Sequence, residues 1–188
     1  MEGNVSKYYT AIYDVAKAMN STLETEEVLK IMVEGAANAT GAKGCALMLL
    51  SPDRRVLRHS ASYGLSDRYI RKGPVMVDIS IAEALKGNTV EVLNAPEDDR
   101  IQYREEAQKE GINSILCVPV MLRDEVIGVI RLYTAEQRHF DMDDIYFLGA
   151  VANLGAIALE KTGLYQTLKR NYDELTQPKE FILEPLPY

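Results

Sequence analysis

The stretch SILCVPVMLRDEVIGVIRLYTAEQRHFDMDDIYFLGAVANLGAIALE, residues 114–160, decides the fold of this chain. Two apolar runs, 114–122 and 125–133, flank the short polar link Arg123-Asp124, a pattern typical of a β-hairpin. A long amphipathic helix is predicted to begin near Asp141. We expect the hairpin to form the centre of a sheet and the helix to cover it.

The composition indicates a single soluble domain with terminal extensions. The chain has 188 residues, of which 47% are hydrophobic, enough to bury a sizeable core. The excess of acidic residues gives a net charge of −7, which argues against nucleic acid or an anionic membrane as the main partner. No apolar run approaches the ~18 residues of a membrane span, and residues 1–19 lack the pattern of a signal peptide. We therefore expect a cytoplasmic protein.

The remaining segments predict an α+β design with a mainly antiparallel sheet, because hairpin connections dominate. Thr25 is the expected N-cap of the second helix, and Gly41 is expected to end it. Pro119 lies within a strand, so its missing N–H is expected to face an edge, a bulge or a pocket. The other predicted helices are 5–19, 25–38, 67–72, 80–86 and 97–110, and the other predicted strands are 44–51, 55–62 and 89–93.

The last helix, predicted over 142–175, carries a heptad seam that points to a partner helix. It would be roughly 50 Å long, more than the sheet of so small a domain needs. The seam comprises Phe147, Val151, Leu154, Ala158, Lys161, Tyr165, Leu168, Tyr172 and Leu175. The expected organisation is an N-terminal helix for a dimer bundle (1–22), a central domain (23–160), a helical extension (161–177) and a proline-containing tail (178–188).

Several short motifs, taken in their order and spacing, resemble a GAF domain over residues 23–160. They are Gly64-Leu65, Ala84-Leu85 with Gly87-Asn88-Thr89-Val90, Gly111-Ile112 with residues 114–120, residues 126–130, and Phe140 with Asp143-Asp144. The resemblance implies a PAS-related fold with a six-stranded antiparallel sheet. It places short lid helices over a ligand cavity on one face and the terminal helices, commonly a parallel dimer bundle, on the other. The sixth strand, at 75–79, is implied by the resemblance alone.

Specialised branches of that family fit less well. Phe140 and Asp144 match half of the cyclic-nucleotide motif, but Ile145 replaces its glutamate, and both residues have a structural explanation. Neither cysteine has the neighbouring histidine that bilin attachment uses, and His59 and His139 give no metal-ligand spacing and are expected at the surface. A free methionine sulfoxide reductase needs an attacking thiolate and a resolving thiol, whereas Cys45 and Cys117 both lie in apolar runs that favour buried thiols.

These observations predict a non-enzymatic sensory or regulatory domain that acts as a homodimer, with a possible small-molecule ligand and a partner protein that carries the output. The sequence identifies no cofactor and no metal site. A reductase-like enzyme and a purely structural dimerisation module remain alternatives. The candidate ligand-binding residues are aromatic and polar side chains around the lid, together with one strand cysteine: Tyr63, Tyr69, Arg100, Tyr103, Arg104, Asn113 and Cys117.

Overall fold

The computed structural model describes residues 2–21, 24–77 and 82–176 and has the predicted α+β architecture. Its centre is a six-stranded sheet in the order β3-β2-β1-β6-β5-β4, and every neighbouring pair is antiparallel. The strands are β1 (Gly44–Leu50), β2 (Val56–Tyr63), β3 (Val75–Met76), β4 (Val90–Val92), β5 (Ser114–Leu122) and β6 (Glu125–Thr134). The sixth strand, implied by the family resemblance alone, is therefore present as the short β3; residues 78–79 of that prediction lie outside the described part.

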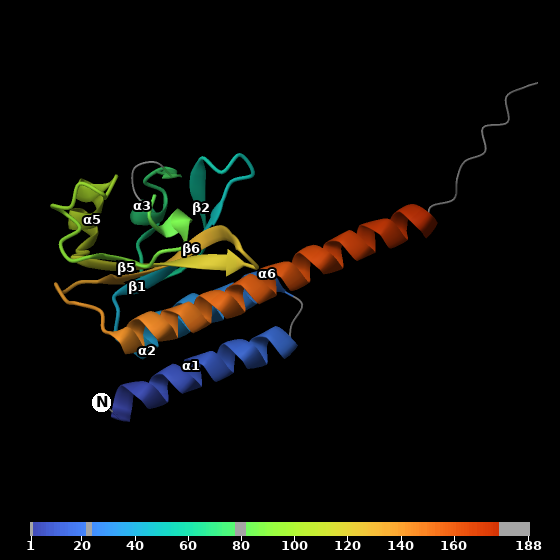
Figure 1. Ribbon diagram of the computed structural model, residues 1–188, viewed down its shortest axis with the longest axis horizontal. Helices are drawn as coiled ribbons and strands as arrows, with labels where there is room; N and C mark the ends of the chain where they lie inside the picture. The colour runs from blue at the N-terminus through green and yellow to red at the C-terminus, as the bar shows by residue number, and fades with distance from the viewer. Residues whose placement is uncertain (1, 22–23, 78–81, 177–188) are drawn as a thin grey trace, which may run out of the picture.

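Helices cover one face of the sheet and short lid elements cover the other (Figure 1). On the helical face, α2 and α6 pack on the strands, and α1 packs on α2 and α6 as an outer layer. The long helices are α1 (Glu2–Ser21), α2 (Thr25–Thr40) and α6 (Met142–Thr176); the lid contains α3 (Asp67–Ile70), the 3₁₀ helix η1 (Ala84–Lys86) and α5 (Arg104–Glu110).

The β5–β6 hairpin forms as the sequence predicts, and two of its residues explain how it fits its neighbours. A Cβ on Gly128 would lie 2.3 Å from the carbonyl oxygen of Met48 in β1, so glycine lets the two strands approach closely. Pro119 lies past the last β5 residue that pairs with β4, Cys117, and next to a register shift after Val120. Of the expected settings for the proline, an edge, a bulge or a pocket, the first two are therefore found at this position.

Alternating strand residues supply the apolar clusters on the two faces of the sheet. Side chains such as Leu47, Leu116 and Leu132 face the helices and join their apolar residues in the larger core. Side chains on the opposite face, such as Met48 and Val129, pack beneath the lid. The helical layer therefore shares one continuous core with the sheet, and any ligand under the lid would touch the other face.

Three local predictions about helix ends and lengths need correction. The helix expected from Thr25 has Glu24 as its N-cap residue, and Thr25 is its first helical residue. The lid helix predicted over 80–86 is only the 3₁₀ turn η1 among the described residues. The helix predicted over 97–110 forms only at Arg104–Glu110, because the Asp98 side chain accepts the Arg100 N–H at 2.9 Å and holds a turn instead.

Candidate functional site

A charged side chain lies in the middle of the sheet, on its lid face. Arg131 pairs with Cys117 on one side and with Ala46 on the other, and its side chain is only 5% exposed. Its neighbours include the Cys117 thiol and the hydroxyl groups of Tyr69 and Tyr133. A guanidinium stays protonated in proteins, so a permanent positive charge lies beneath the lid.

His59 reaches the same face through a β-bulge. Leu47 pairs with Ala61 and the next residue of β1, Met48, pairs with His59, so one extra residue of β2 reverses the facing of the strand at this point. Burial, followed by the charges of Lys72 and Arg131, lowers the pKa of His59 from 6.5 to about 4. The histidine is therefore half-buried and neutral at pH 7, and the prediction that it lies at the surface was wrong.

Lys72, in the segment after α3, places a second positively charged side chain over the sheet. Its ammonium group lies 3.7 Å from the centre of the Tyr69 ring and donates a hydrogen bond of 3.0 Å to the Tyr69 carbonyl oxygen. Tyr69 is buried and packs edge-on against Tyr133, with ring centres 5.9 Å apart. Burial and the charge of Arg131 lower the pKa of Lys72 from 10.5 to about 8, although Glu106 and Glu110 of α5 act in the opposite sense.

Two adjacent side chains, Gln102 and Tyr103, bind the backbone of the lid segment that follows Lys72. The Tyr103 hydroxyl donates to the Pro74 carbonyl oxygen at 2.9 Å, and the Gln102 amide oxygen accepts the Met76 N–H at 2.8 Å. Gly73 has a φ of +126°, which favours glycine, and a Cβ there would lie 2.6 Å from the Tyr103 hydroxyl and displace it. Tyr103 therefore holds the segment that follows Lys72 against the rest of the lid.

The structure brings some of the predicted site residues together and leaves others apart. Tyr69, Tyr103 and Cys117 lie around the Arg131 group described above. The other predicted residues have contacts of their own at the rim. Arg100 pairs with Asp98 at 2.6 Å, Arg104 pairs with Asp99 at 2.6 Å, the Asn113 amide donates to the Ala135 carbonyl oxygen at 2.6 Å, and Tyr63 is 38% exposed at the end of β2.

Sequence reasoning missed Arg131, His59 and Lys72 as members of one cluster. Only Arg131 carried a signal, since it is the single charged residue inside the apolar run 126–133. His59 depends on a bulge, and Lys72 depends on how the lid folds back, so their convergence follows from pairing between distant segments.

Asp144, which matches part of the cyclic-nucleotide motif, has a structural role at the start of α6. Asp144 is buried, and its carboxylate accepts hydrogen bonds from the Tyr8 hydroxyl of α1 at 2.6 Å and from Arg138 at 2.9 Å. The Tyr8 ring also stacks on Phe147 with centres 4.3 Å apart. Asp141 accepts the Asp144 N–H at 2.8 Å, which confirms the predicted N-cap. These contacts fix the start of α6 to α1.

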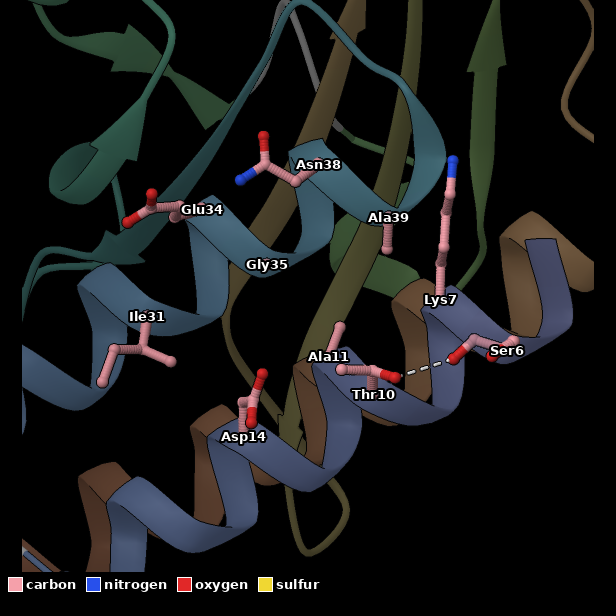
Figure 2. A pocket seen from close by; sticks show the side chains of 10 residues that line it. All are labelled: Ser6, Lys7, Thr10, Ala11, Asp14, Ile31, Glu34, Gly35, Asn38 and Ala39. Carbon is pink, nitrogen blue, oxygen red and sulfur yellow. Dashed lines mark hydrogen bonds between the residues drawn. The ribbon is translucent and has the colours of Figure 1, made fainter. Parts of the chain in front are cut away.

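A groove of about 530 Å³ lies between α1 and α2, and Figure 2 shows its lining. Small residues let the helices approach, since a Cβ on Gly35 would lie 3.5 Å from that of Ala11. Lys7 and Asp14 extend from α1 beside the polar residues Glu34 and Asn38 of α2. None of the predicted site residues lines this groove.

An apolar stripe is exposed on the outer surface of α1 and α6. These two helices run parallel, because Tyr8 contacts Asp144 and the Lys161 ammonium donates to the Met19 carbonyl oxygen at 2.7 Å. The predicted seam residues Phe147, Val151, Leu154 and Ala158 instead pack within the protomer's own core. The exposed stripe contains Tyr9 (71% exposed), Tyr13 (65%), Tyr146 (69%), Ile157 (52%) and Leu164 (65%).

The apolar character of α6 also satisfies a purely compositional test for a membrane span. Residues 142–164 are long and apolar enough to cross a bilayer, although no other helix in the described part of the chain is. Part of this segment is buried against the sheet, and core helices of soluble proteins pass the same test. It is thus weak evidence for a membrane.

The two cysteines lie on opposite faces of the sheet. Cys45 belongs to the core beneath the helices, whereas Cys117 belongs to the core beneath the lid. Burial raises the pKa of the Cys45 thiol well above its usual range. The described residues also contain no cluster of three histidine, cysteine, aspartate or glutamate side chains that could hold a metal ion.

Comparison with known proteins gives a family match and a sensor relative. A family model described as GAF domain matches residues 22–160. A methyl sulfide methyltransferase-associated sensor from Methanosarcina acetivorans is 27% identical over 164 residues, covering 84% of this chain but 16% of the relative. The chain thus spans about a sixth of the length of that curated relative.

Solved structures share the fold at lower sequence identity. The GAF domain of a phosphoenolpyruvate-protein phosphotransferase from Coxiella burnetii aligns with a TM-score of 0.76 at 17% identity, covering 86% of this chain and 98% of that one. A free methionine-R-sulfoxide reductase from Neisseria meningitidis aligns with a TM-score of 0.69 at 18% identity, covering 84% and 91%. The same architecture therefore occurs in a domain of a phosphotransferase and in a reductase.

Proposed function

The chain belongs to the GAF domain family, and from this premise we propose that it is a non-enzymatic sensory module. A small molecule binds beneath the lid, and the bound state is relayed through a homodimer formed by the terminal helices. The sensor relative supports the sensory role. The output passes to a partner protein or to further domains, in a cytoplasmic setting.

The observation that carries this proposal is the exposed apolar stripe on α1 and α6. Its aromatic and aliphatic residues are more than half exposed, which is costly for side chains of this size in an isolated protomer. Because α1 and α6 run parallel, a second copy related by a two-fold axis would cover both with the same surface.

A chain of contacts offers a route from the lid to this stripe. Arg100 of the lid rim donates to the Glu91 carbonyl oxygen of β4 at 3.1 Å, and the Glu91 carboxylate accepts the Phe140 N–H at 2.7 Å. The neighbouring Arg138 then binds Asp144, which holds Tyr8 of α1. A ligand that binds one lid arrangement better than another can bias the helices only through such contacts.

The placement of the cysteines argues for the sensory role over the reductase alternative. Cys45 and Cys117 lie on opposite faces of the sheet, so neither can resolve a sulfenic acid or disulfide formed on the other within one protomer. The likeness to the Neisseria meningitidis enzyme concerns the fold alone. We expect no thiol-dependent turnover of free methionine sulfoxide.

Sedimentation velocity tests the homodimer. We expect the wild-type chain to sediment as a dimer at micromolar concentration and the Ile157→Asp and Leu164→Asp variants to sediment as monomers, because a carboxylate in an apolar interface would be buried without a partner. Thr89→Asp, which adds the same charge at an exposed position near the lid, serves as the control. A monomeric wild type, or dimeric stripe variants, would contradict the proposal.

A thermal-shift screen against a panel of small metabolites tests ligand binding. A molecule that binds only the folded state raises the unfolding temperature, and the stabilisation grows with the logarithm of its concentration once that concentration exceeds the Kd. We expect at least one compound to stabilise the dimer. If none does and native mass spectrometry of the purified chain finds no bound molecule, the domain is a structural dimerisation module.

A further inference from the structure

The side chains that converge beneath the lid share one chemical property. Arg131, Lys72 and His59 each carry, or can accept, a positive charge, and they come from three separate segments of the chain. They lie close enough to oppose one another, since Lys72 and Arg131 disfavour the charged form of His59, and Arg131 disfavours that of Lys72. Like charges gathered in a partly buried place are a cost that a bound anion would offset.

His59 adds a second, independent observation. Neither of its ring nitrogens has a hydrogen-bond partner in the described part of the chain, although both are shielded from solvent. Buried polar atoms in folded proteins are nearly always paired. A neutral imidazole donates a hydrogen bond through one of its ring nitrogens, so the unmet donor of His59, beside a lysine ammonium, points to a ligand that carries an oxygen acceptor.

The surroundings of the three basic side chains are aromatic and apolar. Tyr69 and Tyr103 flank Lys72, whose ammonium lies 3.7 Å and 5.7 Å from their ring centres. Beneath these groups lies the apolar cluster that includes Met48, Cys117 and Val129. A compact oxygen-bearing group beside the cations, with a short apolar remainder over the sheet, matches these walls.

We propose that Lys72, His59 and Arg131 form a binding site for a small oxyanion, either a carboxylate or a phosphate group. Lys72 and His59 donate hydrogen bonds to the anion, and Arg131 supplies a fixed charge in the sheet below. The Tyr103–Pro74 hydrogen bond holds the segment that carries Lys72, so we expect anion binding to be coupled to the position of this part of the lid. The inference deepens the proposed function and rests on its ligand lying beneath the lid.

The two histidines of the chain allow a direct test by NMR of their ring C–H signals. The full-length chain is titrated with inorganic phosphate, and separately with acetate, against potassium chloride at equal ionic strength. We expect the His59 signals to move and saturate with one of the two anions, because the site recognises oxyanion chemistry. The signals of His139, which is exposed, should follow ionic strength alone.

The Lys72→Met variant supplies the matched comparison. It keeps the length of the side chain, removes a partly buried charge and should therefore fold at least as stably as the wild type, while its apparent affinity for the anion falls by about tenfold or more. Lys109→Met, on the exposed surface of α5, should bind the anion unchanged.

Failure of this inference is distinguishable from failure of the proposed function. If neither phosphate nor acetate moves the His59 signals, or if Lys72→Met responds like the wild type, the oxyanion site is wrong. The sensory proposal then survives only if the metabolite screen still finds a stabilising compound, which would bind through other side chains. If that screen also finds none, both proposals fall.

Discussion

His59 makes the stability of this domain dependent on pH at the level of a single residue. Its pKa falls from 6.5 in the unfolded chain to about 4 in the folded one, chiefly through burial. The unfolded state therefore binds more protons between these values, so the stabilisation is complete above pH 6.5 and is lost as the pH falls toward 4. Allowing for partial solvent screening, we expect a loss of about 2 kcal/mol.

Urea unfolding at several pH values measures this loss. The free energy of unfolding of the wild type should fall by about 2 kcal/mol more than that of His59→Phe between pH 7 and pH 4.5. His139→Gln, which alters the exposed histidine, should behave like the wild type. Equal slopes for the wild type and His59→Phe would show that His59 is not buried beneath the lid.

At the level of single residues, the sequence predicted the aromatic residues and the cysteine of the candidate site but not its basic residues. Tyr69, Tyr103 and Cys117 were predictable because aromatic residues and a strand cysteine near a lid are typical of small-molecule sites. Lys72 and His59 were not predictable. A bulge in β2 places His59, and the fold of the segment after α3 places Lys72, and no local sequence pattern indicates either feature.

At the scale of elements, two glycines with apolar neighbours in the sequence, Gly128 and Gly149, differ in how closely other atoms surround them. A methyl group at Gly128 of β6 would lie 2.3 Å from a backbone oxygen of β1, which cannot move without opening the sheet. A methyl group at Gly149 of α6 would meet no atom within 4 Å among the described residues. Glycine is therefore needed for close packing at the strand position but not at the helix position.

Alanine substitution at these positions tests the packing of β1 against β6. We expect Gly128→Ala to lower the free energy of unfolding by about 2–3 kcal/mol, because the sheet must deform. Gly149→Ala should raise it by about 0.5–1 kcal/mol, because alanine favours the helix. Chemical denaturation measures both, and a neutral Gly128→Ala would show that the strands do not approach as described.

The elements that sequence reasoning predicted well are those whose signals are local. The β5–β6 hairpin and α6 follow from periodicity, a two-residue link and the Asp141 cap. The turn around Asp98 was missed because a side-chain hydrogen bond competes with helix formation there. The first part of α6 covers the sheet as expected, and its seam residues Phe147, Val151 and Ala158 belong to the protomer's own core.

At the scale of the whole molecule, a homodimer makes thermal stability depend on protein concentration. Unfolding of a dimer to two separate chains becomes less favourable as concentration rises, by about 1.4 kcal/mol of dimer for each tenfold increase. We expect the unfolding temperature of the wild type to rise across a hundredfold concentration range and that of Ile157→Asp to stay constant. A constant unfolding temperature for the wild type would exclude dimerisation as the state that melts.

The unbroken length of α6 has a mechanical consequence. Its 35 residues form one helix that begins beside the Tyr8–Asp144 contact and extends beyond the sheet (Figure 1). The core holds this helix as far as Ala158, and the Lys161 ammonium binds the Met19 carbonyl oxygen, so only the part beyond that contact can act as a lever arm. The roughly 15 residues beyond it span about 22 Å, so a tilt of about 10° would displace the far end by roughly 4 Å. A partner bound to that end would thus be displaced by about the diameter of a methyl group.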